Sequence, residues 1–396
     1  MDIDEYEFFD TYTSPATGIS DLNFRAARYM LRPFTLHSKE FHEYWDETKG
    51  MLKKLFQTRN ELIGIVGSIR VGFDAIISNI TEPGDKVLVL TNGYWGSYTS
   101  RVVESYGGTP ILHEEAPTCA LNPKKVENEI EKHKDLKAVT IMHVETDTGI
   151  MHPVGEIGKI VKDKTNALYI VDAATSLGGM EVKTDEWGVD FCFSGSHKCL
   201  SAPVGLAFMT VSDEGWDSIE KRKSSILGTY NNLLPWRTPI RGECEPPLPA
   251  CVIHAVRARL DYIFRHGPKK IFKRHEIAAK AFRLGLIEMG LELLSESPES
   301  PPCSNVVTVA KIPTGVNEEK LSKIMCERYN VWFGSSPYRE RVFQLGTINE
   351  NQVNPKHILY YLTSLGLTLL ELGVEVRLEE AIRKTNEVLL DLEKYK

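Results

Sequence analysis

The sequence has few cysteines, and their arrangement would build neither a disulfide framework nor a zinc site. Its 396 residues contain seven cysteines, which are scattered, and no Cys-x-x-Cys pair occurs. Disulfide-rich secreted domains and small zinc modules have regularly spaced cysteines. His143 is interpreted as a structural histidine, because no cluster of histidines and cysteines surrounds it. We therefore expect reduced thiols, no bound metal ion and a cytoplasmic protein.

The chain also lacks a basic stripe and a long apolar run. The formal net charge is −7 and the pI is about 5.9. Nucleic acids and anionic membranes select clustered lysines and arginines, so we expect small-molecule partners, no nucleic acid and no membrane. No apolar run reaches the length that spans a bilayer. The acidic start MDIDEYEFFDTY has no basic flank before an apolar core, so neither a signal peptide nor a transit peptide is expected.

The stretch 167–211 contains three apolar runs that are rich in β-branched and aromatic residues. The first ends at Asp172 in VDAATSLGG, the second leads to Lys198 in SGSHKCLSAPVG, and the third ends at Val211. Such runs are typical of buried strands, and ligands of open α/β sheets bind beyond the strand ends. We therefore expect the Asp172 carboxylate and the Lys198 amine to converge in one crevice.

A carboxylate and an amine in an apolar crevice suit the chemistry of pyridoxal phosphate. The amine would form an imine with the cofactor aldehyde, and the carboxylate would keep the ring nitrogen protonated. The residue types alone leave an alternative open. In that alternative Lys198 is a solvated loop lysine, and Asp172 caps a helix that begins at Ala173.

These two motifs resemble the aspartate and lysine motifs of class V aminotransferases, a family of fold-type I enzymes that depend on pyridoxal phosphate. The likeness covers almost the whole chain and is greatest to alanine–glyoxylate (serine–pyruvate) and pyridoxamine–pyruvate aminotransferases. The resemblance implies that Lys198 is the Schiff-base lysine and that Asp172 holds the pyridinium proton. It also implies a homodimer with active sites at the interface and an N-terminal arm, residues 1–20, that crosses to the partner.

The turn VGSIRVG is a candidate phosphate site. Ser68, Ile69 and Arg70 stand where a strand gives way to a helix, and free backbone N–H groups at a helix start bind anions. The turn matches neither a Walker loop nor a GxGxxG fingerprint, so a bare strand–turn–helix connection is the alternative. The family usually has small residues here, and Arg70 would add charge. Leu248 stands where the family has a threonine that reaches the partner's phosphate, which is a second departure.

The resemblance assigns further cofactor-binding residues. Trp95 corresponds to the aromatic residue that stacks on the cofactor ring, and Thr146 to the residue whose hydroxyl binds the phenolic oxygen. Ala174 and His197 flank the aspartate and lysine and complete the predicted set. Without the resemblance, a tryptophan after a strand is more often a core residue, and a solvated loop is the alternative for 145–147.

The stretch SSPYRERVFQLG is predicted to bind substrate. Related aminotransferases place an arginine before Ile-Gly, where it binds the substrate carboxylate through two parallel hydrogen bonds. Gln344 takes that position here. Two interpretations remain open: Arg339 or Arg341 compensates, or one substrate lacks the usual α-carboxylate. We favour compensation and expect an aminotransferase that moves an amino group from an amino acid or amine to a small 2-oxo acid of the pyruvate or glyoxylate type.

Two other functions fit parts of the pattern. A pyridoxal-phosphate-dependent lyase such as a cysteine desulfurase also has a His-Lys pair, like His197-Lys198, but it needs a nucleophilic cysteine that SSPYRER lacks. A non-catalytic binding protein of the same fold would explain the altered phosphate turn. The retained Asp172 and Lys198 argue against that second alternative.

Apolar periodicity predicts two domains after the arm. Strands alternating with helical stretches indicate parallel βαβ units, so we expect a large doubly wound, mostly parallel α/β domain over 21–267. The stop signal His266-Gly267-Pro268 marks the start of a small α+β domain, 268–396. The expected elements are helices at 41–56, 252–264, 273–294, 318–329, 356–371 and 378–395, strands at 62–66, 86–90, 137–143, 305–310 and 331–333, and a long loop over 227–249.

Overall fold

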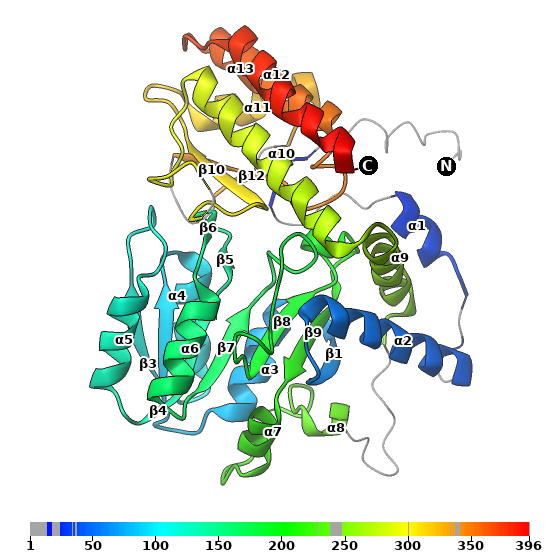
Figure 1. Cartoon of the computed structure of the whole chain (residues 1–396), viewed down its shortest axis with the longest axis vertical. Coiled ribbons are helices and arrows are strands. Elements are labelled where there is room, and N and C mark those ends of the chain that lie inside the picture. Colours follow the sequence, from blue (N-terminus) through cyan, green and yellow to red (C-terminus); the bar gives the residue numbers. More distant parts are fainter. Residues whose placement is uncertain are drawn as a thin grey trace.

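In the computed structural model, a seven-stranded and a three-stranded β-sheet organise the chain. The structure describes residues 14–17, 24–33, 35, 38–226, 228–237, 248–299, 301–332, 334–336 and 341–395. Figure 1 shows the larger sheet in the lower part of the molecule and the smaller one, with the C-terminal helices, in the upper part. The hairpin of β5 (Val144–Glu145) and β6 (Ile150–Met151) lies where the two parts meet.

The large sheet has the strand order β1-β9-β8-β7-β4-β2-β3. Its strands are β1 (Glu61–Gly67), β2 (Lys86–Thr91), β3 (Thr109–Glu114), β4 (Leu136–Met142), β7 (Leu168–Asp172), β8 (Phe191–Gly195) and β9 (Gly205–Val211). All neighbours pair in parallel except β9, which is antiparallel to both β8 and β1. The predicted mostly parallel α/β fold is confirmed. The link from β8 to β9 is too short for a crossover helix, so the chain must reverse there.

Helices cover both faces of this sheet. Alternate residues of its central strands accordingly belong to two different hydrophobic clusters. In β7, Tyr169 and Val171 belong to one cluster, and Leu168 and Ile170 to the other. Strands buried on both faces appear in a sequence as continuous apolar runs. The first cluster includes α2 (Lys39–Phe56), α5 (Pro123–Lys132), α6 (Val154–Lys164) and α9 (Ala250–His266), and the second includes α3 (Arg70–Ile80), α4 (Tyr94–Ser105) and α7 (Asp213–Glu220).

A third hydrophobic cluster belongs to the C-terminal part of the chain. It packs α10 against α12 and α13 through side chains such as Phe282, Leu286 and Leu362. The small sheet, in the order β10-β12-β11, is antiparallel. The elements of this C-terminal part are α10 (Pro268–Met289), β10 (Val307–Lys311), α11 (Glu318–Tyr329), β11 (Gly334–Ser335), β12 (Val342–Gly346), α12 (Pro355–Glu371), α13 (Leu378–Leu389) and the 3-10 helix η3 (Leu390–Tyr395). Gly267 separates α9 from α10, at the predicted domain boundary.

Several predicted element ends differ from the structure. The helix expected over 273–294 is α10, which ends at Met289 because Gly290 adopts a left-handed conformation (φ 96°) and its N–H donates to Ile287. The strand expected at 331–333 is replaced by β11, which begins at Gly334, three residues after the predicted start. The last predicted helix ends at Leu389 and continues only as η3. The remaining elements are α1 (Phe24–Met30), α8 (Leu234–Arg237) and the 3-10 helix η2 (Lys198–Leu200).

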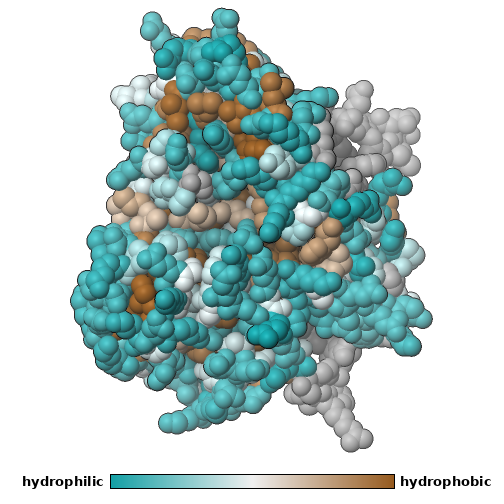
Figure 2. Space-filling model, viewed as in Figure 1, coloured by the Kyte–Doolittle hydropathy of each residue, from teal (hydrophilic) through white to brown (hydrophobic). Residues whose placement is uncertain are grey.

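Polar residues cover most of the face that Figure 2 shows, with a hydrophobic patch in its upper part. Among the described residues, no helix combines the length and the apolar composition that crossing a membrane requires.

Only 14–17 of the predicted N-terminal arm are described, and there the Pro15 carbonyl accepts a hydrogen bond from Gly346 at the end of β12. Residues 238–247 of the predicted long loop lie outside the described residues.

Candidate active site

A pocket of about 350 Å³ lies at the ends of β4, β7 and β8. All nine residues predicted to bind the cofactor line it: Ser68, Ile69, Arg70, Trp95, Thr146, Asp172, Ala174, His197 and Lys198. Phe73, Met142, Val144, Thr175 and Val204 complete its wall. The sequence analysis did not identify these last five residues, most of which carry apolar side chains without a chemical signature.

Strand direction brings the predicted residues together. Asp172 ends β7, and β8 runs parallel beside it with Phe193 opposite Asp172. Because β1 and β8 are both antiparallel to β9, β1 also ends at this edge of the sheet. Gly67 ends β1 with φ 145°, and a Cβ there would lie 2.5 Å from Val71 Cγ2, so glycine allows the turn into α3.

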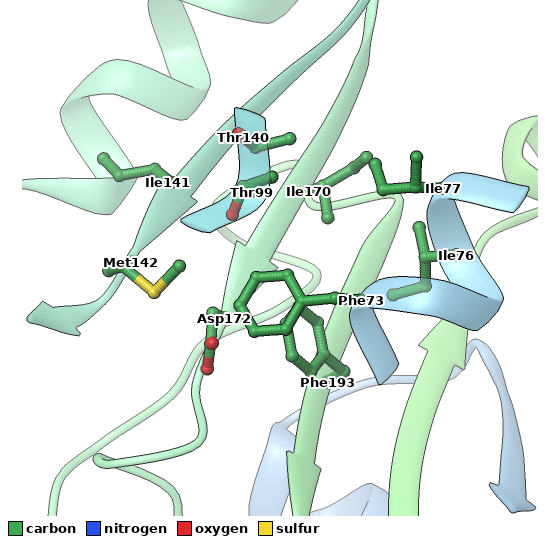
Figure 3. Close-up of a pocket in the computed structure, with 10 residues that line it drawn as sticks. All are labelled: Phe73, Ile76, Ile77, Thr99, Thr140, Ile141, Met142, Ile170, Asp172 and Phe193. Atoms are coloured by element: carbon green, nitrogen blue, oxygen red, sulfur yellow. The ribbon is translucent and has the colours of Figure 1, made fainter. Parts of the chain in front are cut away.

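The Asp172 carboxylate lies in apolar surroundings. Figure 3 shows it between Met142 and the rings of Phe73 and Phe193. Its Oδ1 accepts a hydrogen bond of 2.6 Å from the Ala174 N–H. Burial raises the pKa of Asp172 to about 7, although that hydrogen bond and the charge of Lys198 act in the opposite direction. A cation beside the carboxylate would favour its ionised form, so the site fits a ligand with a protonated ring nitrogen.

No helix begins at Ala173, so that part of the alternative drawn from the sequence is wrong. Residues 174–176 form a turn, and Asp172 holds this turn through Ala174 instead of capping a helix. The turn brings Thr175 into the pocket, where its hydroxyl lies 2.6 Å from the Thr146 hydroxyl. The carboxylate therefore both faces the pocket and orders part of its wall.

Lys198 begins η2 and reaches into the same pocket. Its Nζ donates to Thr146 Oγ1 at 3.3 Å, and burial of the amine lowers the pKa of Lys198 while Asp172 opposes this shift. A lowered pKa leaves more of the amine neutral, as attack on an aldehyde requires. The backbone of Lys198 is left-handed (φ 62°), a conformation that costs a non-glycine residue on the order of 1–3 kcal/mol. The surrounding turn must hold it in place.

Residues 145–147 are buried, so the alternative of a solvated loop is wrong. Glu145 accepts hydrogen bonds from the Gly96 N–H at 2.9 Å and from the Asp147 N–H at 3.0 Å. Burial raises the pKa of Glu145 to about 7. This carboxylate connects the first turns of α4, which carry Trp95, to the turn that carries Thr146. It therefore fixes two walls of the pocket relative to each other.

The opposite wall is cationic and aromatic. The Arg70 guanidinium lies 5.2 Å from the centre of the Trp95 ring and 5.6 Å from that of Tyr98. No side chain caps the start of α3, where Ser68 and Ile69 lie. Burial lowers the pKa of His197 to about 4, and its buried Nδ1 has no hydrogen-bond partner among the described residues. A helix start without a side-chain cap, a guanidinium and an imidazole form a donor set that fits a phosphate.

The predicted substrate residues do not line this pocket among the described residues. Gln344 lies on β12, where its Oε1 accepts from the Thr17 hydroxyl at 2.7 Å and its Nε2 donates to the Asp147 carbonyl at 3.4 Å. Arg341 donates to backbone carbonyls between 312 and 316, including Pro313 at 2.7 Å. Arg339 lies outside the described residues.

His143 belongs to a buried polar network behind the pocket. Its Nδ1 lies 2.8 Å from the Ser176 hydroxyl, and its ring packs edge-on against Trp187. Burial lowers the pKa of His143 to about 4, so the ring is neutral at pH 7.

Leu248 is partly buried and packs against the first hydrophobic cluster of the large sheet.

A family model and a relative that is more than 30% identical both identify the family of this chain. The family model described as Aminotransferase class-V matches residues 30–310. An uncharacterized aminotransferase of Methanocaldococcus jannaschii is 36% identical over 357 residues, covering 89% of this chain and 91% of that protein. The pyridoxamine–pyruvate transaminase of Mesorhizobium japonicum is 28% identical over 300 residues, covering 74% and 75%. The crystal structure of ureidoglycine–glyoxylate aminotransferase from Bacillus subtilis matches with a TM-score of 0.88 at 29% identity, covering 95% and 97%.

Proposed function

Because the chain belongs to the class V aminotransferase family, whose members depend on pyridoxal phosphate, we propose that it moves an amino group from an amino acid or amine to a small 2-oxo acid of the pyruvate or glyoxylate type. The observation that carries this proposal is the meeting of Asp172 and Lys198 in one pocket. The names of the Bacillus and Mesorhizobium relatives support the acceptor class, since glyoxylate and pyruvate are both small 2-oxo acids.

Lys198 and Asp172 take the chemical roles. When bound, pyridoxal phosphate supplies an aldehyde that reacts with amines and a ring that takes up the electron pair released at the substrate carbon. Lys198 is the residue that would hold the cofactor covalently, and its Nζ would move the proton at the substrate carbon. The Asp172 carboxylate would hold the proton of the ring nitrogen. The raised pKa of Asp172 supports this role, because a facing cation would stabilise the buried carboxylate.

The other pocket residues bind and orient the cofactor. Trp95 would hold the ring by stacking, and Thr146, whose hydroxyl contacts Lys198 Nζ, would donate a hydrogen bond to the phenolic oxygen. The start of α3, with Ser68, Ile69 and Arg70, would hold the phosphate together with His197. The apolar residues of the pocket would exclude water.

The protein is proposed to act as a cytoplasmic homodimer with its pocket at the subunit interface. Val204 lines the pocket and is 37% exposed, so the pocket wall reaches the molecular surface, where a second copy can lie. The described cysteines are free thiols, which fits the cytoplasm. Sedimentation of the purified protein at several concentrations tests the dimer.

The function is tested by a donor and acceptor screen with the purified holoenzyme. We expect the visible absorbance of the bound cofactor to fall on addition of an effective amine donor and to return on addition of pyruvate or glyoxylate. A set of donors that never changes the absorbance, or a change that no 2-oxo acid reverses, would contradict amino transfer. Release of sulfur or of an alkene product would instead indicate lyase chemistry.

The cysteine desulfurase alternative finds no support in the described residues. No cysteine lines the pocket, and Cys303 is buried with its thiol donating to the Ser297 carbonyl. The alternative of a non-catalytic binding protein is opposed by the joint presence of Asp172 and Lys198. An ordinary aminotransferase is therefore the function that the site supports best.

Arg339 is proposed to bind the acceptor carboxylate in place of the arginine that Gln344 replaces. Arg339→Ala is expected to raise the acceptor KM by roughly 10- to 100-fold, because a charge-assisted hydrogen bond contributes about 1.5–3 kcal/mol. The kcat should change much less. Steady-state kinetics with an active donor and varied 2-oxo acid measures both constants.

Two variants from the same stretch serve as controls. Arg341→Ala should leave the acceptor KM near the wild-type value, because Arg341 already binds carbonyls of the 312–316 loop. Gln344→Arg restores the arginine that related aminotransferases have at this position. This variant should be tolerated if the protein withstands the loss of the hydrogen bond between residue 344 and Thr17. If Arg339→Ala and Arg341→Ala both behave like wild type, the proposal that this stretch binds the α-carboxylate of the acceptor is wrong.

A further inference from the structure

A buried arginine connects the turn that carries Lys198 with the C-terminal part of the chain. Arg259 lies on α9 and is 5% exposed. Its Nε donates to the carbonyl oxygen of Cys199, the residue after Lys198, at 3.2 Å. Its Nη1 lies 3.5 Å from Glu350 Oε2, in the segment between β12 and α12. One side chain therefore contacts both the Lys198 turn and a loop that follows the small sheet.

Packing alone gives no reason for an arginine at this position. Its neighbours on the buried face of α9, Val256, Leu260 and Ile263, are apolar and belong to the core of the large sheet. Burial lowers the pKa of Arg259, and the charge of Glu350 is the largest effect that opposes this. A buried guanidinium is unfavourable unless its partners offset the lost hydration. The guanidinium also lies 5.2 Å from the centre of the Tyr262 ring on its own helix. Its contacts with Cys199 and Glu350 reach other parts of the chain and therefore point to a role beyond filling space.

The first contact holds a strained turn. Lys198 (φ 62°) and Ser201 (φ 54°) are both left-handed, and Cys199 lies between them. Non-glycine residues keep this conformation only where their surroundings hold it. Cys199 is fixed from two sides, because its thiol donates to the Thr175 carbonyl at 3.2 Å and its own carbonyl accepts from Arg259. The same carbonyl also accepts from Ser201 Oγ at 3.5 Å, so Arg259 is one of the groups that fix the turn from which Lys198 extends.

The second contact reaches the segment after β12. Within that segment, the Thr347 carbonyl lies 2.6 Å from His275 Nδ1 on α10, so the loop is attached to the C-terminal part. One residue earlier, the Gly346 N–H donates to Pro15, and Gln344 on the same strand binds Thr17. A shift of β12 or of the N-terminal segment would therefore move Glu350 relative to Arg259.

We propose that Arg259 is a positioning residue for Lys198 and that its ion pair with Glu350 makes the position of Lys198 depend on the placement of the β12 loop. This inference rests on the proposed role of Lys198 as the lysine that holds the cofactor. Arg259 touches neither the pocket nor the reacting atoms, so its effect is transmitted through the backbone of Cys199.

The test compares the holoenzymes Glu350→Gln, Arg259→Lys and the double variant with wild type. We expect each single variant to lower kcat by between about 5- and 100-fold, since a small displacement of a catalytic group has effects of this size. The KM values should stay within about two-fold. The midpoint of the pH titration of the cofactor absorbance should shift, because it reports the surroundings of Lys198 Nζ. The double variant should lose no more than the worse single variant.

Arg257→Lys is the matched control. Arg257 lies on the same helix but pairs with Glu47 and Asp261 at 3.1 Å, away from Cys199, and it should keep the wild-type kcat and titration midpoint. If Arg259→Lys does not fold, Glu350→Gln decides alone, because Glu350 is partly exposed.

The outcomes separate this inference from the proposed function. Borohydride reduction of wild type and variants identifies the labelled lysine. A label on Lys198 together with wild-type kcat and titration midpoint in Glu350→Gln and Arg259→Lys would overturn the positioning role. Additive losses in the double variant would overturn the coupling to Glu350. A label on a different lysine in wild type would remove the proposed role of Lys198 itself.

Discussion

Replacement of Lys198 by alanine is expected to abolish the borohydride-reducible bond between protein and cofactor and to lower kcat by at least about 10³-fold, because proton transfer by a positioned group alone contributes about 10²–10⁴-fold. The protein should still fold and hold pyridoxal phosphate noncovalently. Its other pocket residues, including Trp95 and Asp172, are untouched. Lys198 belongs to none of the hydrophobic clusters, so its replacement removes no contact within them.

Reduction with borohydride followed by peptide mass spectrometry measures this result directly. The surface variant Lys221→Ala is the control, since Lys221 pairs with Asp217 in an exposed helix turn and its loss should leave labelling and rate unchanged. Partial recovery of Lys198→Ala by an added small amine would support the role of Nζ in moving a proton. Label on another lysine, or near-normal turnover by Lys198→Ala, would contradict the assignment.

Replacement of Asp172 by alanine is expected to lower turnover by several orders of magnitude, about 10³-fold or more, because the electron-accepting ring depends on its protonated nitrogen. Among the described residues that line the pocket, Asp172 is the only carboxylate, and Phe73, Met142 and Phe193 beside it are apolar, so no other anion there could replace it. The unprotonated ring would then withdraw electrons poorly. Cofactor binding should weaken as well, since the counter-charge of the ring is lost.

The isosteric variant Asp172→Asn separates charge from structure. It can keep the hydrogen bond from Ala174 N–H that orders the 174–176 turn, but it carries no charge. We expect it to be as slow as Asp172→Ala while retaining more of the cofactor. Single-turnover rates and the cofactor absorbance measure the two effects. Rapid turnover by Asp172→Asn would show that the carboxylate serves only the turn and that another group protonates the ring.

Local patterns predicted the positions of Asp172 and Lys198 because both follow strands that are buried on two faces. Leu168, Ile170 and Phe191 appear as apolar runs whatever lies above or below them, so the strand ends could be found without knowing the neighbouring helices. The motifs around these ends also resemble the family that the comparisons identified. The stop at Gly290 was present in the sequence too, but the apolar pattern continues past it and concealed the end of α10.

The substrate end could not be predicted in the same way. Gln344 was compared with an arginine that binds substrate, whereas its amide contacts Thr17 and Asp147 from distant parts of the chain. The burial of 145–147 likewise depends on α4, because Glu145 binds the Gly96 N–H. Polar residues in a loop carry no local mark that separates a solvated turn from a buried one.

The sequence by itself determined the family and the strand ends, and it supplied the two residues for which chemical roles are proposed, because strand burial and motif spacing are properties of residues close together in the chain. Only the tertiary structure decided the burial of Glu145 against α4 and the buried contacts that hold Lys198. The carbonyl of Cys199 meets Arg259 only after α9 has packed on the large sheet, and Arg259 meets Glu350 only after the C-terminal part has joined it. Such contacts depend on how helices and sheets pack, which no stretch of neighbouring residues specifies.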